Sequence, residues 1–234
     1  MASQRSPEPD IRFEVPLYRM AEAAKYLGVP TTTFATWAKG YVRRPLVTAL
    51  PSDGRNYPTI PFIGLAEGMA LAAFRSKGVT MQRIRPALMV LAETVGLEHA
   101  LASKALYTDG AEVLYDYAER QGDTPEAMDT RELVVVRKGQ RVFTEVVQDY
   151  LQRIKYGPDG YARLIHLPDY HHAEVVADPE RSFGQPIFAH GAARVDDVLE
   201  RFWAGDDLGM VSDEFGVPLA ELEDVLRVAS RRAA

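Results

Sequence analysis

Apolar residues near the start of the chain recur at helical spacing in two neighbouring segments. Met20, Ala24 and Leu27 stand at i, i+4 and i+7, which predicts the buried face of one helix. Gly28-Val29-Pro30 ends that helix and turns the chain. The next helix has an expected inner face of Phe34, Trp37, Ala38 and Tyr41. Residues 17–41 are therefore predicted to form a helix-turn-helix.

The outer face of the second helix is small, hydroxylated or basic. Thr31 is its expected N-cap. The face itself comprises Thr31, Thr32, Ala35, Thr36 and Lys39. Such side chains suit a helix in a DNA groove, because they allow close approach to base edges and phosphates. A purely structural helical hairpin is the alternative interpretation.

Residues 47–60 are predicted to form a wing, a β-hairpin beside that helix. Pro51-Ser52-Asp53-Gly54 is a turn signal between two short extended runs. The surrounding cations, which are candidates for neutralising DNA phosphates, are Arg43, Arg44 and Arg55. Tyr57 has two interpretations: it contacts a backbone phosphate, or it closes the hairpin.

Two longer helices are predicted next, over residues 64–76 and about 80–95. Apolar positions of the second helix alternate in steps of three and four residues, as in the a and d positions of a heptad. They are Met81, Ile84, Leu88, Leu91 and Val95. Two heptads are too few for a coiled coil, so this helix is predicted to serve packing or dimerisation.

The middle of the chain, residues 97–172, has a mixed pattern. It predicts a small antiparallel sheet with one helix, over residues 144–153. The other predicted parts are a hairpin over 106–117 turning at Asp109-Gly110, a polar loop over 120–130, a strand over 132–136 and a hairpin over 153–167 turning at Gly157–Gly160.

The last part of the chain shows three short amphipathic segments separated by glycine. They predict helices over about 194–204, 207–215 and 218–231, a trihelical, homeodomain-like unit with a second helix-turn-helix geometry. The expected outer face of the last helix carries Ala220, Glu221, Glu223, Asp224 and Arg227. Its three carboxylates would repel a phosphate backbone, so this face is predicted to bind protein.

Together the patterns predict an α+β protein in several parts. A disordered tail is expected over residues 1–12 and a winged helix-turn-helix DNA-binding domain over 13–96. A small α+β linker domain over 97–172 and the trihelical unit over 173–234 complete the prediction.

The distribution of charge separates the two ends of the chain, although the whole 234-residue chain has a net charge of −6. Residues 1–96 hold 12 Lys or Arg and 7 Asp or Glu, a balance of +5. Residues 97–172 hold 9 and 13, and residues 173–234 hold 6 and 13, so their balances are −4 and −7. DNA binding needs local positive charge only, so the N-terminal third is the part suited to DNA.

Cysteine usage and apolar runs bound the cellular context. The chain has no cysteine, which excludes disulfides and zinc–thiolate sites and fits a reducing cytosol. It also has no apolar run of about eighteen residues and no apolar core in its first ten, so neither a membrane span nor a signal peptide is expected. A cytoplasmic protein is predicted.

The chain is predicted to be no enzyme and to bind no cofactor and no metal. No phosphate-binding loop, dinucleotide motif or catalytic serine or zinc motif occurs. The cluster of His166, Asp169, His171 and His172 lacks standard ligand spacing. Adjacent carboxylates such as Asp206-Asp207 point in different directions, so a solvated acidic face is the simpler interpretation. A metal-dependent nuclease that uses the acidic tail is the enzymatic alternative.

Two stretches of the N-terminal part resemble the MerR-type winged helix. AEAAKYLGVPTTTFATWAKG is similar to the first two helices of that family, and GVTMQRIRPAL (78–88) to the entry of its fourth helix. The wing here is longer and richer in proline, and the long coiled-coil helix and ligand-sensing domain of the family are missing.

Residues 178–231 resemble a second family, the small trihelical proteins called "domain of unknown function 433". The resemblance rests on Asp178-Pro179, Gly184-Gln185-Pro186-Ile187, FWAGDDLGMVSDEFGV and LAELEDVLRVA. The combined architecture is similar to VapB-type antitoxins, whose toxins are PIN-domain ribonucleases.

The resemblance implies an antitoxin that neutralises a PIN-domain ribonuclease and represses its own operon. The expected partners are operator DNA, the toxin and, because half-sites mirror a protein two-fold axis, a second copy of the chain. An acidic tail suits the basic face that a ribonuclease needs for RNA. A stand-alone MerR-like regulator without a toxin partner is the alternative.

Overall fold

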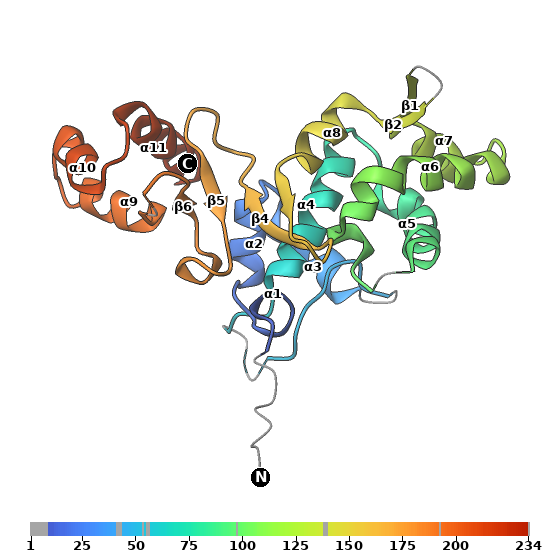
Figure 1. The fold of residues 1–234 in the computed structure, drawn as a ribbon, viewed down its shortest axis with the longest axis horizontal. Coiled ribbons are helices and arrows are strands. Elements are labelled where there is room, and N and C mark those ends of the chain that lie inside the picture. The colour runs from blue at the N-terminus through green and yellow to red at the C-terminus, as the bar shows by residue number, and fades with distance from the viewer. Residues whose placement is uncertain are drawn as a thin grey trace, which may run out of the picture.

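A computed structural model describes residues 9–40, 44–52, 54, 57–96, 98–137, 140–191 and 193–233. Figure 1 shows two helical ends joined by a narrow sheet. Helices α1 to α8 form the larger end, and the three C-terminal helices α9, α10 and α11 form the smaller one. The strands β4 and β5 run between them. The mixed α+β fold is confirmed.

The N-terminal helix-turn-helix is present as predicted. It consists of α2 (Met20–Tyr26) and α3 (Thr31–Lys39), preceded by the short α1 (Ile11–Glu14). Phe34, Trp37 and Ala38 are buried on the inner face of α3. The prediction that Thr31 caps α3 is wrong, because Pro30 is the N-cap residue and Thr31 is the first helical residue, with no side-chain cap.

Over the described residues 47–52, 54 and 57–60, the predicted wing has the form of a loop and contains no regular strand ladder. Across it, the Leu50 N–H donates to the Thr59 carbonyl at 2.7 Å. Ile60 pairs instead with Tyr18, each backbone N–H donating to the other's carbonyl. Two prolines of the loop, Pro51 and Pro58, explain the difference, because they lack the N–H that a ladder needs.

Helix α4 (Phe62–Ser76) lies at the centre of the larger end (Figure 1). Every residue from Phe62 to Phe74 is buried. Gly68 allows the close approach of the helix-turn-helix, since a Cβ there would lie 2.7 Å from the Phe34 ring. Burial of a helix on all sides is typical of the central element of a core.

Helix α5 (Met81–Val95) packs inside the chain against α6 and α7. Leu88 and Leu91 of its heptad-like seam are buried within this single chain. Of the two roles predicted for this helix, the structure shows packing.

Two predictions for the next segment are wrong. Residues 104–121 form the helix α6 (Lys104–Gln121), not a hairpin. Its buried residues recur at helical spacing, and Gly110 packs against the Phe143 ring, where a Cβ would lie 3.2 Å from Cζ. The predicted polar loop contains α7 (Pro125–Arg131), which begins with Pro125 and is capped by the Thr124 hydroxyl.

The strands form two separate antiparallel sheets. The first pairs β1 (Val134–Arg137) with β2 (Gln140–Phe143). The second has the order β3-β4-β5-β6. Its strands are β3 (Ile154–Tyr156), β4 (Ala162–His166), β5 (Val175–Ala177) and β6 (Ile187–Phe188). Because Ile165 pairs with Ala177, this sheet crosses the predicted boundary between residues 172 and 173.

The remaining elements complete the chain. Helix α8 (Glu145–Leu151) follows β2, and short 3-10 turns lie at Ala100–Ala102 (η1) and Ser182–Gly184 (η2). The three predicted C-terminal helices are present as α9 (Val195–Trp203), α10 (Leu208–Phe215) and α11 (Leu219–Ala233).

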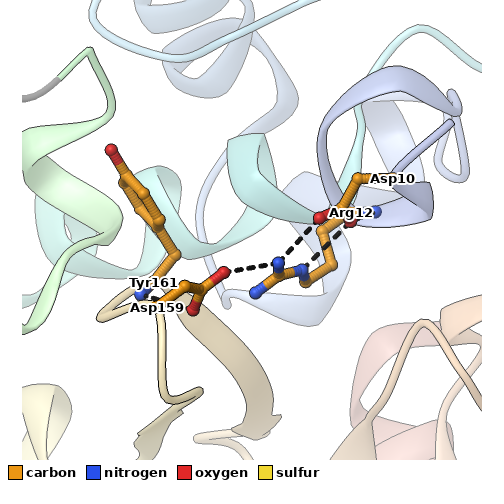
Figure 2. A network of polar contacts seen from close by, with 4 residues as sticks. All are labelled: Asp10, Arg12, Asp159 and Tyr161. Atoms are coloured by element: carbon orange, nitrogen blue, oxygen red, sulfur yellow. Dashed lines mark hydrogen bonds and ion pairs between the residues drawn. The ribbon is translucent and has the colours of Figure 1, made fainter. Parts of the chain in front are cut away.

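Arg12 ties the start of the chain to the β3–β4 turn (Figure 2). Its guanidinium donates to Asp10 at 2.7 and 3.0 Å and to Asp159 at 2.5 Å. Asp10 also caps α1, and Asp159 accepts from the Tyr161 backbone N–H. The predicted disordered tail over residues 1–12 is therefore too long, since residues 9–12 are part of the fold. Hydrogen bonds from Arg12 lower the pKa of both carboxyls.

Replacing Arg12 by Met is expected to destabilise the protein by about 1 kcal/mol at pH 7, a modest value because both carboxylates are partly exposed. Lowered carboxyl pKa values stabilise the folded state above the unfolded pKa of about 4, and this contribution is lost as pH falls through the folded pKa values. Urea unfolding at pH 7 and pH 3 measures it. A cost that is the same at both pH values would contradict this assignment.

Candidate nucleic-acid interface

The outer face of α3 is open to solvent. Thr31, Thr32, Thr36 and Lys39 are all exposed, while Phe34 and Trp37 hold the other side of the helix in the core. The Thr36 hydroxyl donates to the Thr32 carbonyl at 2.9 Å, so its oxygen still has a lone pair for a donor. The structure therefore brings all four predicted α3 residues to one accessible surface.

The predicted wing residues are placed only in part. Arg44 is exposed, and its carbonyl accepts from the Arg85 guanidinium at 2.5 Å, which holds the backbone at this point. Arg43 and Arg55 lie outside the described residues. The Tyr57 ring is 65% exposed and lies against Gly54, where a Cβ would come within 3.1 Å of it. The ring therefore closes the loop and also presents its outer surface.

Residues 173–234 form the acidic C-terminal tail. Its last helix, α11, does not expose the face that the sequence predicts to be exposed. Asp224 is only 1% exposed, and its Oδ2 accepts the backbone N–H groups of His171, His172 and Ala173 at 2.7, 2.8 and 3.1 Å. Glu221 is also buried, with the His190 ring 3.7 Å away. The prediction that both carboxylates are exposed for a partner is wrong, because α11 turns this face onto the loop that precedes β5. Glu223 and Arg227 are exposed.

Burial raises the pKa of Asp224, but the three backbone N–H groups outweigh burial and keep the pKa below its ordinary value. The carboxylate is therefore charged in the folded protein at neutral pH. It fastens the tail to the rest of the chain.

The tail also packs against the helix-turn-helix. The buried Tyr18 hydroxyl donates to the Gly184 carbonyl at 2.9 Å, and the Tyr26 hydroxyl donates to the Gln185 side chain at 3.1 Å. The loop before β5 also approaches the helix-turn-helix, since a Cβ at Gly28 would lie 2.8 Å from an Asp169 carboxylate oxygen. These contacts leave the outer face of α3 exposed. They join residues far apart in the chain, which no local pattern reveals.

Within the described ranges, no three His, Asp or Glu side chains lie close enough together to hold a metal ion. No helix among the described residues is both long and apolar enough to cross a bilayer.

The sequence is similar to a known DNA-binding domain and to a known antitoxin. Residues 16–88 match a family model described as a "putative DNA-binding HTH domain". The chain is 48% identical over 230 residues to the "putative antitoxin VapB45" of Mycobacterium tuberculosis, and the match covers 94% of this chain and 96% of that protein. The chain belongs to the VapB-type antitoxin family. It is an antitoxin with an N-terminal helix-turn-helix DNA-binding domain.

A solved structure supports the fold of this antitoxin. The crystal structure of Rv2018 from Mycobacterium tuberculosis superposes with a TM-score of 0.86 at 50% sequence identity. The match covers 92% of this chain and 99% of that one.

A buried carboxylate in the antitoxin sets the path of the chain after α3. Glu67, on α4, accepts the Thr48 backbone N–H at 2.6 Å and the Thr48 hydroxyl at 3.1 Å. The His99 Nδ1 lies 3.0 Å from the same carboxylate. The clamp holds the start of the predicted wing against α4. One signal was visible in the sequence: Glu67 is the single charged residue between Phe62 and Phe74.

His99 is expected to make stability depend on pH. The hydrogen bond to Glu67 raises the pKa of His99 above its ordinary value, although burial opposes this. A raised histidine pKa stabilises the folded state fully below the unfolded pKa of about 6.5, and that contribution is lost as pH rises through the folded pKa. Replacing His99 by Gln should therefore cost more stability at pH 5.5 than at pH 9.

Chemical denaturation at the two pH values measures the difference. His171→Gln is the matched control, because the His171 side chain is exposed. An identical cost of His99→Gln at both pH values would rule out a charged His99–Glu67 pair.

Proposed function

We propose that this antitoxin binds operator DNA of its own operon through α3 and neutralises a PIN-domain ribonuclease through its acidic part. The DNA-binding part of the proposal rests on one observation, the outward face of α3. Its exposed residues are Thr31, Thr32, Thr36 and Lys39. The match of residues 16–88 to a DNA-binding domain supports it.

In this proposal the threonines and the cations have different roles. Thr31, Thr32 and Thr36 contact base edges or phosphates in the major groove. Cations supply most of the affinity by neutralising phosphates and releasing counterions. They are Lys39, Arg43, Arg44 and Arg55, and Tyr57 adds a backbone contact. The resemblance to the MerR-type winged helix supports the same docking of α3.

The proposed DNA-bound form is a homodimer that acts as an autorepressor. A single helix-turn-helix reads only a short half-site, and dimers place two recognition helices about 34 Å apart along one face of the duplex.

The toxin half of the proposal rests on charge. Residues 97–234 carry 26 Asp or Glu against 15 Lys or Arg. A ribonuclease must present positive charge to RNA, so an acidic surface can cover its active face. Glu223 and Arg227, exposed on α11, are included in the proposed protein-binding surface. The resemblance to VapB-type antitoxins identifies the partner class as a PIN-domain ribonuclease.

The competing regulator without a toxin has one observation in its favour. An open cavity of about 430 Å³ lies between the segment that follows α3 and helix α5, lined by Arg44, Leu46, Glu67, Leu88 and His99 among others. A small effector bound there would lie next to the DNA-binding element. The presence of a ribonuclease gene beside the antitoxin gene decides between the two functions.

Replacing Arg44 by Ala is expected to weaken binding to all DNA sequences alike, because a phosphate contact carries no base information. The slope of log K against log salt should fall by about 1 in magnitude. Fluorescence anisotropy with the DNA upstream of the gene, at several salt concentrations, measures this. Arg120→Ala, an exposed arginine at the end of α6, is the control. An unchanged slope for Arg44→Ala would count against this docking of the wing.

The toxin half predicts that the purified chain stops RNA cleavage by the ribonuclease encoded beside it. Labelled RNA with Mg²⁺ is incubated with the ribonuclease alone, with the chain alone and with both together. We expect cleavage in the first mixture only, since the chain itself acts as a regulator. Cleavage by the chain alone would favour the nuclease alternative, and undiminished cleavage in the combined mixture would refute neutralisation.

A further inference from the structure

The tail turns one of its helices inward and leaves two outward. Helix α11 buries Leu222, Val225 and Val228 together with Asp224, and its Ala229 lines a cavity with the helix-turn-helix turn. In α10, by contrast, Val211 is the one fully buried residue. Figure 1 shows α9 and α10 at the end of the molecule that lies away from α3. The free face of the tail is therefore formed by α9 and α10.

Two large, exposed apolar side chains flank the turn that joins these two helices. Trp203, the last residue of α9, is 61% exposed, and Met210, in the first turn of α10, is 68% exposed. The turn between them, residues 204–207, includes Ala204 and Gly205. The exposure of the Trp203 ring and the Met210 thioether to water is unfavourable, and burial against a partner would recover this free energy.

The segment that carries these side chains is strongly acidic. From Asp196 to Glu214 it contains seven Asp or Glu and a single Arg, a net charge of −6. Arg201 forms ion pairs with Asp206 and Glu214 at 2.5 and 3.0 Å, so the one cation is occupied within the segment. The residues in the segment that are exposed and acidic include Asp196, Glu200, Asp207 and Asp213. Negative charge in this segment would repel the phosphates of a nucleic acid. The exposed apolar side chains and the surrounding carboxylates fit a protein partner with an apolar pocket and a basic rim.

We propose that the α9–α10 corner, centred on Trp203 and Met210, is the surface that docks onto the ribonuclease. This inference rests on the proposed toxin half of the function. The α9–α10 corner takes the place of the α11 face that the sequence predicted to bind protein, because Glu221 and Asp224 of that face are buried. Tryptophan is among the residues that carry most of the affinity at interfaces, and the acidic surround speeds and orients association with a basic partner.

The two tryptophans of the chain allow a direct test. Trp37 is buried in the helix-turn-helix, whereas Trp203 is exposed. Chain labelled with 5-fluorotryptophan should give two fluorine resonances in NMR, and Trp203→Phe assigns them. We expect the ribonuclease encoded beside the gene to shift or broaden the Trp203 resonance. The DNA duplex from upstream of the gene should leave that resonance in place.

Substitutions supply the energetic test. Trp203→Ala and Met210→Ala are surface changes, and each should raise the concentration for half-inhibition of the ribonuclease about tenfold or more. Affinity for the upstream DNA should stay unchanged. Met128→Ala is the matched control, because Met128 is a 57% exposed methionine on α7. Glu200→Lys with Asp213→Lys should slow association with the ribonuclease and reduce its salt dependence.

The outcomes separate the two proposals. If the wild-type chain does not inhibit the ribonuclease, the proposed toxin function fails. If it inhibits while Trp203→Ala inhibits equally and the Trp203 resonance does not move, the docking surface lies elsewhere. If the resonance moves with chain concentration alone and Trp203→Ala yields a monomer, the corner binds a second copy instead, which also overturns the inference.

Discussion

The structure depends on one constraint, the burial of α4 on every side. A helix whose residues from Phe62 to Phe74 are all apolar, small or internally paired cannot face water, so other elements must cover it completely. The helix-turn-helix packs against it through Gly68, and α8, η1 and α1 cover its remaining faces. Helix α3 is therefore held by a helix that is buried on all sides, which keeps its outer face in a defined orientation.

The same burial gives Glu67 its role. A carboxylate inside a core must find hydrogen-bond donors, because an unpaired buried charge costs far more than one that is paired. Glu67 finds the Thr48 backbone and hydroxyl together with His99. The loop after the recognition helix is fixed as a consequence, and the His99 pKa is raised by the same contact. A polar side chain in the core thus fixes the path of the segment that follows α3.

A second set of polar contacts joins the tail to the rest of the chain. Tyr18 and Tyr26 bind the loop before β6, and Asp224 binds three backbone N–H groups of the loop before β5. The tail is held against the helix-turn-helix by its own inward surfaces. The outer face of α3 and the α9–α10 corner therefore face different surroundings, one basic and one acidic. In the proposed function, the first surface binds DNA and the second binds the protein partner.

Local patterns in the sequence determined the helix-turn-helix, the three tail helices and the β3–β4 hairpin, because apolar spacing, glycine and proline act over a few residues. They were misleading where a tertiary contact outweighed a local signal. Asp109-Gly110 reads as a turn, yet Gly110 is the point where α6 meets Phe143. The acidic face of α11 reads as exposed, yet Asp224 is buried by donors fifty residues away. Which carboxylates face a partner and which hold the fold was decided only by the tertiary structure, because a charge is paired across space and not along the chain.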